Sequence, residues 1–166
     1  MKIKITDIES TSSEVANAAY YQEIILKISK TAEKKKESVL LTNAKDWIFT
    51  FIEGVENAES NSVAGTGSND VATNGVPFWL TVDFKEVKTV TGIQTTHWGA
   101  GYAPSKVEIF SSENGDKWTS IGQWDTKGRN QTITFDERIK TRYLKYQMVT
   151  VPSRVDITKF YIYAWE

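Results

Sequence analysis

The chain has 166 residues, a net charge of −1 and no cysteine, and 40% of its residues are hydrophobic and 25% charged. A chain of this length and composition can bury one ordinary globular core without covalent staples. The near-zero charge offers no basic surface for a nucleic acid, the absence of cysteine excludes disulfides and thiolate sites, and the single histidine excludes a His-rich metal site.

Two short apolar runs lie within residues 1–45. Residues 20–28 place apolar side chains on one face in strand-like alternation, and residues 38–42 form the second run. The charged residues 31–37 between them are typical of a turn. We therefore expect an extra N-terminal β-hairpin, either added to the main domain or forming the tail of a preceding one; a helix across residues 14–28 is the alternative.

Residues 53–77 are rich in Gly, Asn, Ser, Thr and Ala and show no periodicity. A structureless loop of this length is unusual and is more often functional than idle. On both sides of this loop the period is two, with Gly or Asn in the turns, as at Asn114-Gly115. The pattern predicts an antiparallel β-sandwich over residues 46–166. Its expected strands are 47–52, 78–84, 90–95, 106–110, 118–122, 131–135, 142–151 and 157–165.

Several large side chains on these strands fit the alternation expected of an inward face. Because they lie on strands with matching period, we expect them to be core and not ligand contacts. They are Trp79, Phe84, Ile109, Trp118, Tyr143 and Phe160.

Four sequence features occur in the order found in one known family. They are the strand Phe78–Phe84 followed by Gly92-Ile93, a strand ending in the turn Ser112–Trp118, the strand start Arg142-Tyr143-Leu144, and the last strand Phe160–Tyr163. Together they cover about half of the chain. On these features the chain resembles the discoidin, or coagulation-factor type C, domains, and among them most closely the bacterial family-32 carbohydrate-binding modules.

The resemblance implies an all-β, jelly-roll sandwich of the galactose-binding-domain kind. It further implies a non-catalytic, carbohydrate-binding module that anchors a larger bacterial cell-surface or secreted protein to glycans. Such modules stack an aromatic ring on the apolar face of a sugar and read its hydroxyls with polar side chains.

The sequence departs from the family at two places. The Ile-Asp-Gly element upstream of the first strand is missing, and Lys159 stands where many bacterial members carry a glutamate that helps to hold calcium. Both departures argue against a calcium site of the family's kind, although Asp70 and Asp83 are carboxylates that could serve an ion. The sequence therefore predicts no definite cofactor, and a structural calcium stays an open alternative.

The first candidate ligand site is the loop at residues 96–105. It holds His97, Trp98 and Tyr102 beside Gly99 and Gly101, which allow the backbone to bend so that the rings project. The alternatives are that Trp98 folds back into the core and that His97 is an ordinary hydrogen-bonding residue.

Further candidates lie on neighbouring loops. Arg154 could form a bidentate pair with a sugar or carboxylate, or a surface ion pair with Asp156. Asn69, Asp70 and Asn74 of the long loop could complete the rim, although residues of these types more often serve in turns. A further polar loop with Lys127, Arg129 and Asn130 is ranked below them.

Other function classes remain to be compared with glycan binding. No pair of opposed carboxylates, nucleophile elbow or phosphate loop is evident, which argues against an enzyme, although the parent protein could contain one. Protein adhesion and a ligand-free spacer are the alternatives, and an exposed Trp98 would count against the spacer. No membrane insertion is expected. We expect a monomeric, extracellular, cell-surface or periplasmic domain, with no signal peptide visible after Met1.

Overall fold

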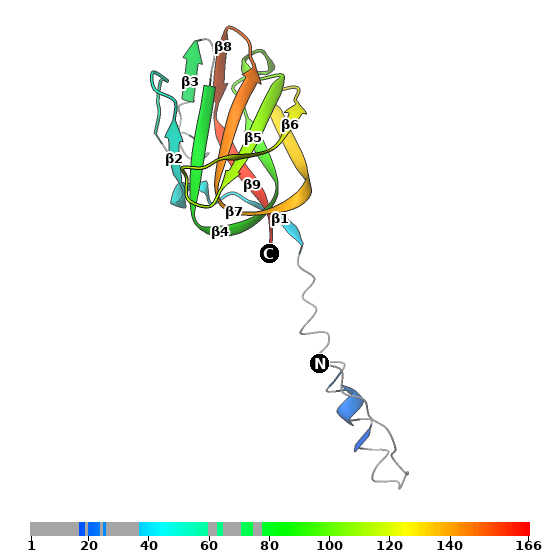
Figure 1. The fold of residues 1–166 in the computed structure, drawn as a ribbon. Coiled ribbons are helices and arrows are strands. Elements are labelled where there is room, and N and C mark those ends of the chain that lie inside the picture. Colours follow the sequence, from blue (N-terminus) through cyan, green and yellow to red (C-terminus); the bar gives the residue numbers. More distant parts are fainter. Residues whose placement is uncertain are drawn as a thin grey trace. The chain divides into compact units, whose positions relative to one another are not determined.

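A computed structural model describes residues 17–18, 20–23, 25, 37–59, 63–64, 71–74 and 78–166. The chain divides into two compact units, Met1–Lys36 and Glu37–Glu166. The described residues of the first unit are helical. None of the described helices is long and apolar enough to cross a membrane. The second unit is an antiparallel β-sandwich (Figure 1).

Nine strands and two short 3₁₀ helices make up the described part of the sandwich. In chain order they are β1 (Ser38–Leu41), η1 (Ala44–Asp46), β2 (Ile48–Phe51), β3 (Val71–Asn74), β4 (Phe78–Thr96), η2 (Ala100–Tyr102), β5 (Lys106–Ser112), β6 (Thr119–Asp125), β7 (Asn130–Thr150), β8 (Arg154–Ile157) and β9 (Lys159–Trp165).

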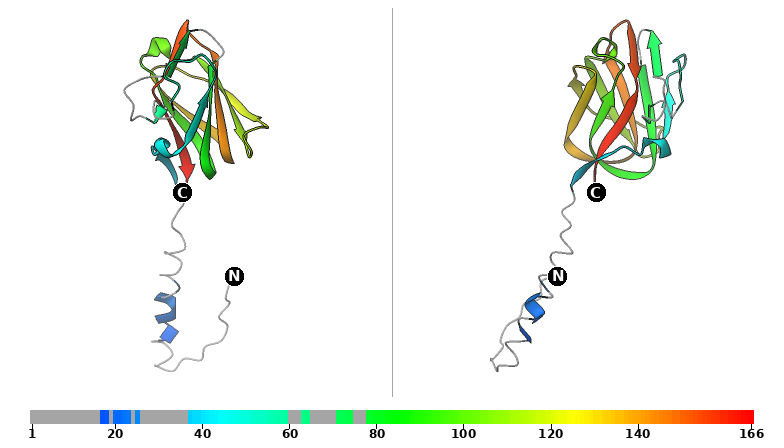
Figure 2. Two further views of the ribbon diagram at one scale, coloured as in Figure 1. Left: turned by 90° about the vertical axis from the view of Figure 1, so that its left-hand side faces the viewer. Right: turned by 180° about the vertical axis from the view of Figure 1, so that it is seen from behind.

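The two layers of the sandwich share the long strands β4 and β7. The front layer joins β2, the first half of β4, the second half of β7, β5 and β6. The back layer joins β1, β9, the second half of β4 and the first half of β7. Figure 1 shows the front layer towards the viewer, and the right-hand view of Figure 2 shows β9 and the back layer from behind. β3 and β8 form a separate two-stranded sheet.

Two reciprocal bulges carry the β4–β7 ladder around the bend between the layers. Residues 84–87 of β4 lie opposite Arg142 alone, and further on residues 135–138 of β7 lie opposite Thr91 alone. The sequence predicted separate strands on each side of these positions. The strands are continuous because each bulge absorbs the extra residues and the ladder then resumes.

Gly92 sits directly after the second bulge and explains the glycine in the Gly-Ile pair. A Cβ at this position would collide with the backbone carbonyl oxygen of Ile133. Only glycine permits the two strands to approach this closely.

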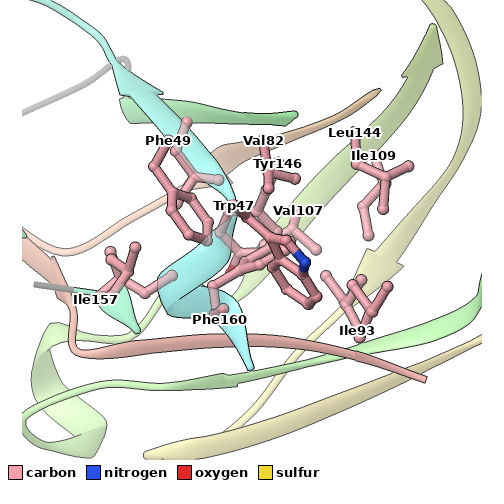
Figure 3. Packing of buried hydrophobic residues seen from close by; sticks show 14 of the residues in the cluster. Trp47, Phe49, Val82, Ile93, Val107, Ile109, Leu144, Tyr146, Ile157 and Phe160 are labelled. Atoms are coloured by element: carbon pink, nitrogen blue, oxygen red, sulfur yellow. The ribbon is translucent and has the colours of Figure 1, made fainter. Parts of the chain in front are cut away.

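Aromatic rings pack edge to face between the two layers. The rings of Trp47 and Phe84 are 5.0 Å apart, and Phe160 lies 5.9 Å from Phe49 and 6.0 Å from Tyr146. Figure 3 shows Trp47, Phe49, Tyr146 and Phe160 among aliphatic side chains from both layers, such as Ile93 and Ile109. Such contacts supply the apolar burial that holds the fold together.

The sandwich predicted from the sequence is confirmed, but the extra N-terminal hairpin is wrong for the described residues. Strand β1 matches its second apolar run and pairs with β9 of the sandwich. Described residues of the first run are helical, as in the alternative reading of residues 14–28. The unit boundary accordingly falls after Lys36, earlier than the expected position 45.

The described part of the segment 53–77 is more ordered than the sequence predicted. Its described part contributes strand β3, a bridge between Glu56 and Ala72, and a bridge between Ala64 and Lys159. Val63 and Val71 are fully buried in the core. Isolated apolar residues of this kind anchor a segment without producing any readable period.

Three of the six expected core residues point outward instead. Phe84, Ile109 and Phe160 are buried. The other three, Trp79, Trp118 and Tyr143, are half-buried. Trp79 and Tyr143 follow the expected alternation, but the front layer carries large apolar side chains on both faces, so alternation alone assigned these two rings to the wrong face. Trp118 lies in the connection before β6, outside the strand expected for it.

Candidate functional site

Three connections meet at one end of the sandwich, which we call the loop end. They follow β4, β6 and β7, and they lie at the top of Figure 1, away from the C-terminus. Backbone hydrogen bonds tie them together: the Ser105 amide donates to Thr150 (2.9 Å), the Thr126 amide to Ser105 (2.9 Å), and the His97 amide to Arg129 (2.9 Å). Loops joined to one another in this way present their side chains on a stable base.

His97 is fully buried at the base of this loop end. Its Nδ1–H donates to the backbone carbonyl of Asp156 (2.5 Å), and its Nε2 lies 3.2 Å from the Thr95 hydroxyl. Burial lowers the pKa of His97 to about 4, although hydrogen bonds to Asp156 and Gln131 partly oppose the shift. The imidazole is therefore neutral near pH 7.

The expectation that His97 contacts a ligand is corrected by this burial. A ring without exposed surface cannot reach a ligand in this structure, whereas its hydrogen bonds join the end of β4 to β8. The sequence could not separate these roles, because a histidine among glycines and polar residues fits both.

Asp156 holds the loop from the other side and was not among the candidate ligand residues. Its buried carboxylate accepts a hydrogen bond from the Trp98 amide (2.8 Å). The sequence signal was an acidic residue inside the otherwise apolar run Val155–Ile157, where a buried charge needs partners. The geometry makes Asp156 a positioning residue for Trp98.

Trp98 and Tyr102 form the exposed part of the loop. Trp98 is 64% exposed and Tyr102 39% exposed. Gly99 is extended and begins η2, whose turn is closed by a hydrogen bond from the Tyr102 amide to the Gly99 carbonyl (3.1 Å). Two exposed rings on a hydrogen-bonded turn can cover the apolar face of a flat ligand.

Arg154 lies on β8 two residues before Asp156, so both side chains leave the same side of that strand. Its guanidinium pairs with the exposed Glu56 (2.8 Å). This contact lowers the pKa of Glu56. Asn74 faces Arg154 across the β3–β8 ladder. Both positions therefore belong to the sheet beside the Trp98 loop.

The remaining candidates divide into two groups. Asn69 and Asp70 lie outside the described residues. Of the lower-ranked loop, Arg129 donates from Nε to the His97 carbonyl (2.9 Å), so it supports the loop. Lys127 and Asn130 are exposed.

The residues at hand do not fit a calcium site. Both carboxylate oxygens of Asp83 accept hydrogen bonds from Arg142 (2.8 and 2.9 Å), and this contact lowers the pKa of Asp83. The exposed Lys159 brings a positive charge where a ligand would be needed. Within the described ranges, no three His, Cys, Asp or Glu side chains gather closely enough to hold a metal ion.

Comparison with known proteins identifies the family of this fold. The sequence model of the F5/8 type C domain matches residues 52–161, which is more than half of the chain. The chain belongs to the F5/8 type C domain family. No curated protein matches it.

Solved structures agree with the F5/8 type C assignment. An F5/8 type C domain from Bacteroides fragilis is 14% identical with a TM-score of 0.63, covering 80% of this chain and 99% of that one. A family-32 carbohydrate-binding module of a Clostridium perfringens family 31 glycoside hydrolase is 22% identical (TM-score 0.57; 74% and 96% covered). The family-32 module of C. perfringens NanJ, solved with galactose, is 18% identical (TM-score 0.57; 75% and 99% covered). At these identities the likeness establishes the shared galactose-binding-like sandwich.

Proposed function

We propose that this F5/8 type C domain is a non-catalytic carbohydrate-binding module whose ligand lies on the Trp98 loop. The observation that carries the proposal is the 64% exposure of Trp98 on a loop that the buried Asp156 and His97 hold in place. A spacer has no need for such a ring. The galactose bound to the NanJ module supports a sugar as the class of ligand.

In the proposed complex, the ring of Trp98 covers the C–H face of a pyranose and Tyr102 flanks it. The hydroxyls are read by polar groups of the neighbouring sheet, with Arg154 and Asn74 as the first candidates. An open site of this kind binds one or two sugar units at roughly micromolar to millimolar Kd. Asn69 and Asp70 remain candidates for the rim.

The proposed role is to anchor a larger extracellular or cell-surface bacterial protein to glycans. Weak binding is sufficient for this, because attachment raises the effective concentration of a linked domain near its polysaccharide. The proposed domain acts as a monomer without catalysis. Two described carboxylates near the loop already have partners: Glu56 pairs with Arg154, and Asp156 accepts a hydrogen bond from the Trp98 amide.

The test is an NMR titration of the chain with mono- and oligosaccharides, galactose among them. We expect shifts on residues 96–103 and a loss of affinity of about tenfold or more in Trp98→Ala. The matched control is Trp165→Ala, which removes the same ring from the opposite end of the sandwich and should leave the affinity unchanged.

Stability distinguishes the alternatives. Because Trp98 is exposed, Trp98→Ala should change the free energy of unfolding by only about 0.5 kcal/mol. If no sugar shifts any resonance of the loop, the glycan proposal fails and the exposed rings become candidates for protein adhesion. A large decrease in the free energy of unfolding of Trp98→Ala would instead show that Trp98 has a structural role.

A further inference from the structure

A groove crosses the outer face of the front layer, away from the Trp98 loop. Alternation along β4 turns Trp79, Thr81 and Asp83 outward while their neighbours are buried. The groove has a volume of about 520 Å³, within the range of ligand sites. Its lining residues are Ile48, Thr50, Trp79, Thr81, Asp83, Gly115, Trp118, Tyr143 and Lys145.

Aromatic rings from three parts of the chain line this groove. Trp79 comes from β4, Tyr143 from β7, and Trp118 from the connection between β5 and β6. That connection lies against the sheet, because a Cβ on Gly115 would meet the Tyr143 ring at 3.4 Å. Each ring is half-buried, so its position is fixed while part of it faces the groove.

Lys145 places a cation beside the Trp79 ring of the groove, and no described carboxylate forms an ion pair with it. The Lys145 Nζ is 5.1 Å from the centre of the Trp79 ring and 5.5 Å from that of Phe110. Asp83, the acidic residue of the groove, is held by Arg142 at 2.8 Å. Among the described residues, no carboxylate forms an ion pair with Lys145. The groove thus joins an apolar platform to an uncompensated positive charge.

We infer that this groove is a second binding site, specific for pyranose units that carry a carboxylate. The rings of Trp79, Trp118 and Tyr143 would cover the C–H faces of the sugar, and Lys145 would pair with its carboxylate. The hydroxyls of Thr50 and Thr81 lie beside the rings and can bond the sugar hydroxyls. This site is separate from the proposed galactose-type site on the Trp98 loop and shares no residue with it.

The position of the groove favours a sugar over an extended peptide. A peptide that adds to a sheet needs an unpaired strand edge. The groove lies over the faces of β2, β4 and β7; β4 and β7 are paired on both edges, and β2 lines the groove with the side chains of Ile48 and Thr50. What remains available is a flat face of rings and hydroxyls, which fits the alternating apolar and polar surfaces of a pyranose.

The chain contains six tryptophans, so indole N–H resonances can report both sites in one titration. Trp79 and Trp118 report the groove, Trp98 reports the loop, and the buried Trp47 serves as the internal reference. The probes are α-1,4-linked galacturonate trimer, glucuronate and mannuronate trimers, and α-1,4-linked galactotriose, which matches the first probe without its carboxylates. Each is added to about 10 mM.

We expect at least one uronate trimer to shift the Trp79 and Trp118 indoles, with galactotriose binding the groove at least about tenfold more weakly. Lys145→Gln should weaken uronate binding by a similar factor, and raised salt should weaken it in the wild type. Lys159→Gln is the matched control, since it removes an exposed charge from the back layer and should leave the groove unchanged.

The outcomes separate the two sites. Silent Trp79 and Trp118 indoles with all three uronate trimers overturn the groove site, whatever Trp98 does. Equal groove binding of galactotriose, or unchanged binding by Lys145→Gln, overturns the charge-based specificity. A silent Trp98 with shifted groove indoles contradicts the loop proposal while supporting the groove.

Discussion

At the scale of single residues, His97 shows how one side chain can look like a ligand contact and act as a support. Its neutral ring joins β8 to the end of β4 through the Asp156 carbonyl. Burial lowers its pKa to about 4, against about 6.5 when it is exposed. Protonation therefore opposes the folded state.

This pKa shift predicts a pH dependence of stability. Between pH 6.5 and 4 the unfolded chain binds a proton that the folded chain does not, so the free energy of unfolding falls as the pH falls through this window. The total loss is roughly 3 kcal/mol and is complete once the pH is below 4. Urea unfolding between pH 7 and 5 measures the upper part of this fall.

The control for this prediction is His97→Gln, which removes the titrating group. Its unfolding free energy should be lower than that of the wild type at pH 7 but nearly flat between pH 7 and 5. Asp83 does not affect the stability between pH 7 and 5. Its pKa is lowered, so the loss of stability that its protonation causes occurs at more acidic pH. A wild-type stability that is constant over the window would contradict the burial of a neutral His97.

The sequence predicted which residues lie on loops better than it predicted the direction in which side chains on strands point. Trp98 and Tyr102 were placed on a loop from their glycine neighbours, and they are exposed there. Trp79 and Tyr143 were assigned to the core because alternation names two faces without saying which is buried. Asp156 was overlooked because its partner, the Trp98 amide, is 58 positions away in the sequence.

At the scale of elements, the bend of β4 depends on an unusual backbone conformation. Lys85 has a φ of 69°, in the region that glycine favours. Its amide donates to the Asp83 carboxylate (2.7 Å), which Arg142 also grips from β7. The bulge is thus held by side-chain contacts in spite of the strain at Lys85.

Lys85→Gly should stabilise the protein by up to about 1 kcal/mol, because the left-handed conformation costs a side-chain-bearing residue roughly this amount. Thermal and urea unfolding measure the gain. Glu86→Gly is the control, since Glu86 has no positive φ and glycine there should destabilise the strand by about 0.5–1 kcal/mol. If both variants lose stability equally, Lys85 is not strained in solution.

The sequence predicted where strands occur, but it did not predict that β4 and β7 each run on as one continuous strand. The turn expected at residues 85–88 is a bulge inside β4, and the gap before residue 142 is bridged by β7. Charged and polar residues mark turns and bulges alike, so only the pairing partner distinguishes them.

At the scale of the whole molecule, the sandwich begins where β1 closes the back layer. We expect a fragment of residues 37–166 to unfold within about 0.5 kcal/mol of the full chain, because the two compact units divide after Lys36. A fragment of residues 43–166 lacks β1 and uncovers β9. It should be less stable by roughly 2 kcal/mol or more.

Urea unfolding of the two fragments and the full chain measures this difference. Equal stability of the two fragments would show that β1 adds nothing to the back layer. Marked destabilisation of the 37–166 fragment would show that the sandwich depends on residues 1–36.

The two ends of the sandwich unit meet each other. The amide of Glu37 donates to the carbonyl of Glu166 (3.1 Å), and the amide of Glu166 donates to the carbonyl of Glu37 (3.2 Å), at the end away from the Trp98 loop. A short linker can therefore join these positions into a covalent ring, and new termini can be cut elsewhere. The same geometry allows the unit to be inserted into a surface turn of a host protein, with its loop end pointing away from the host.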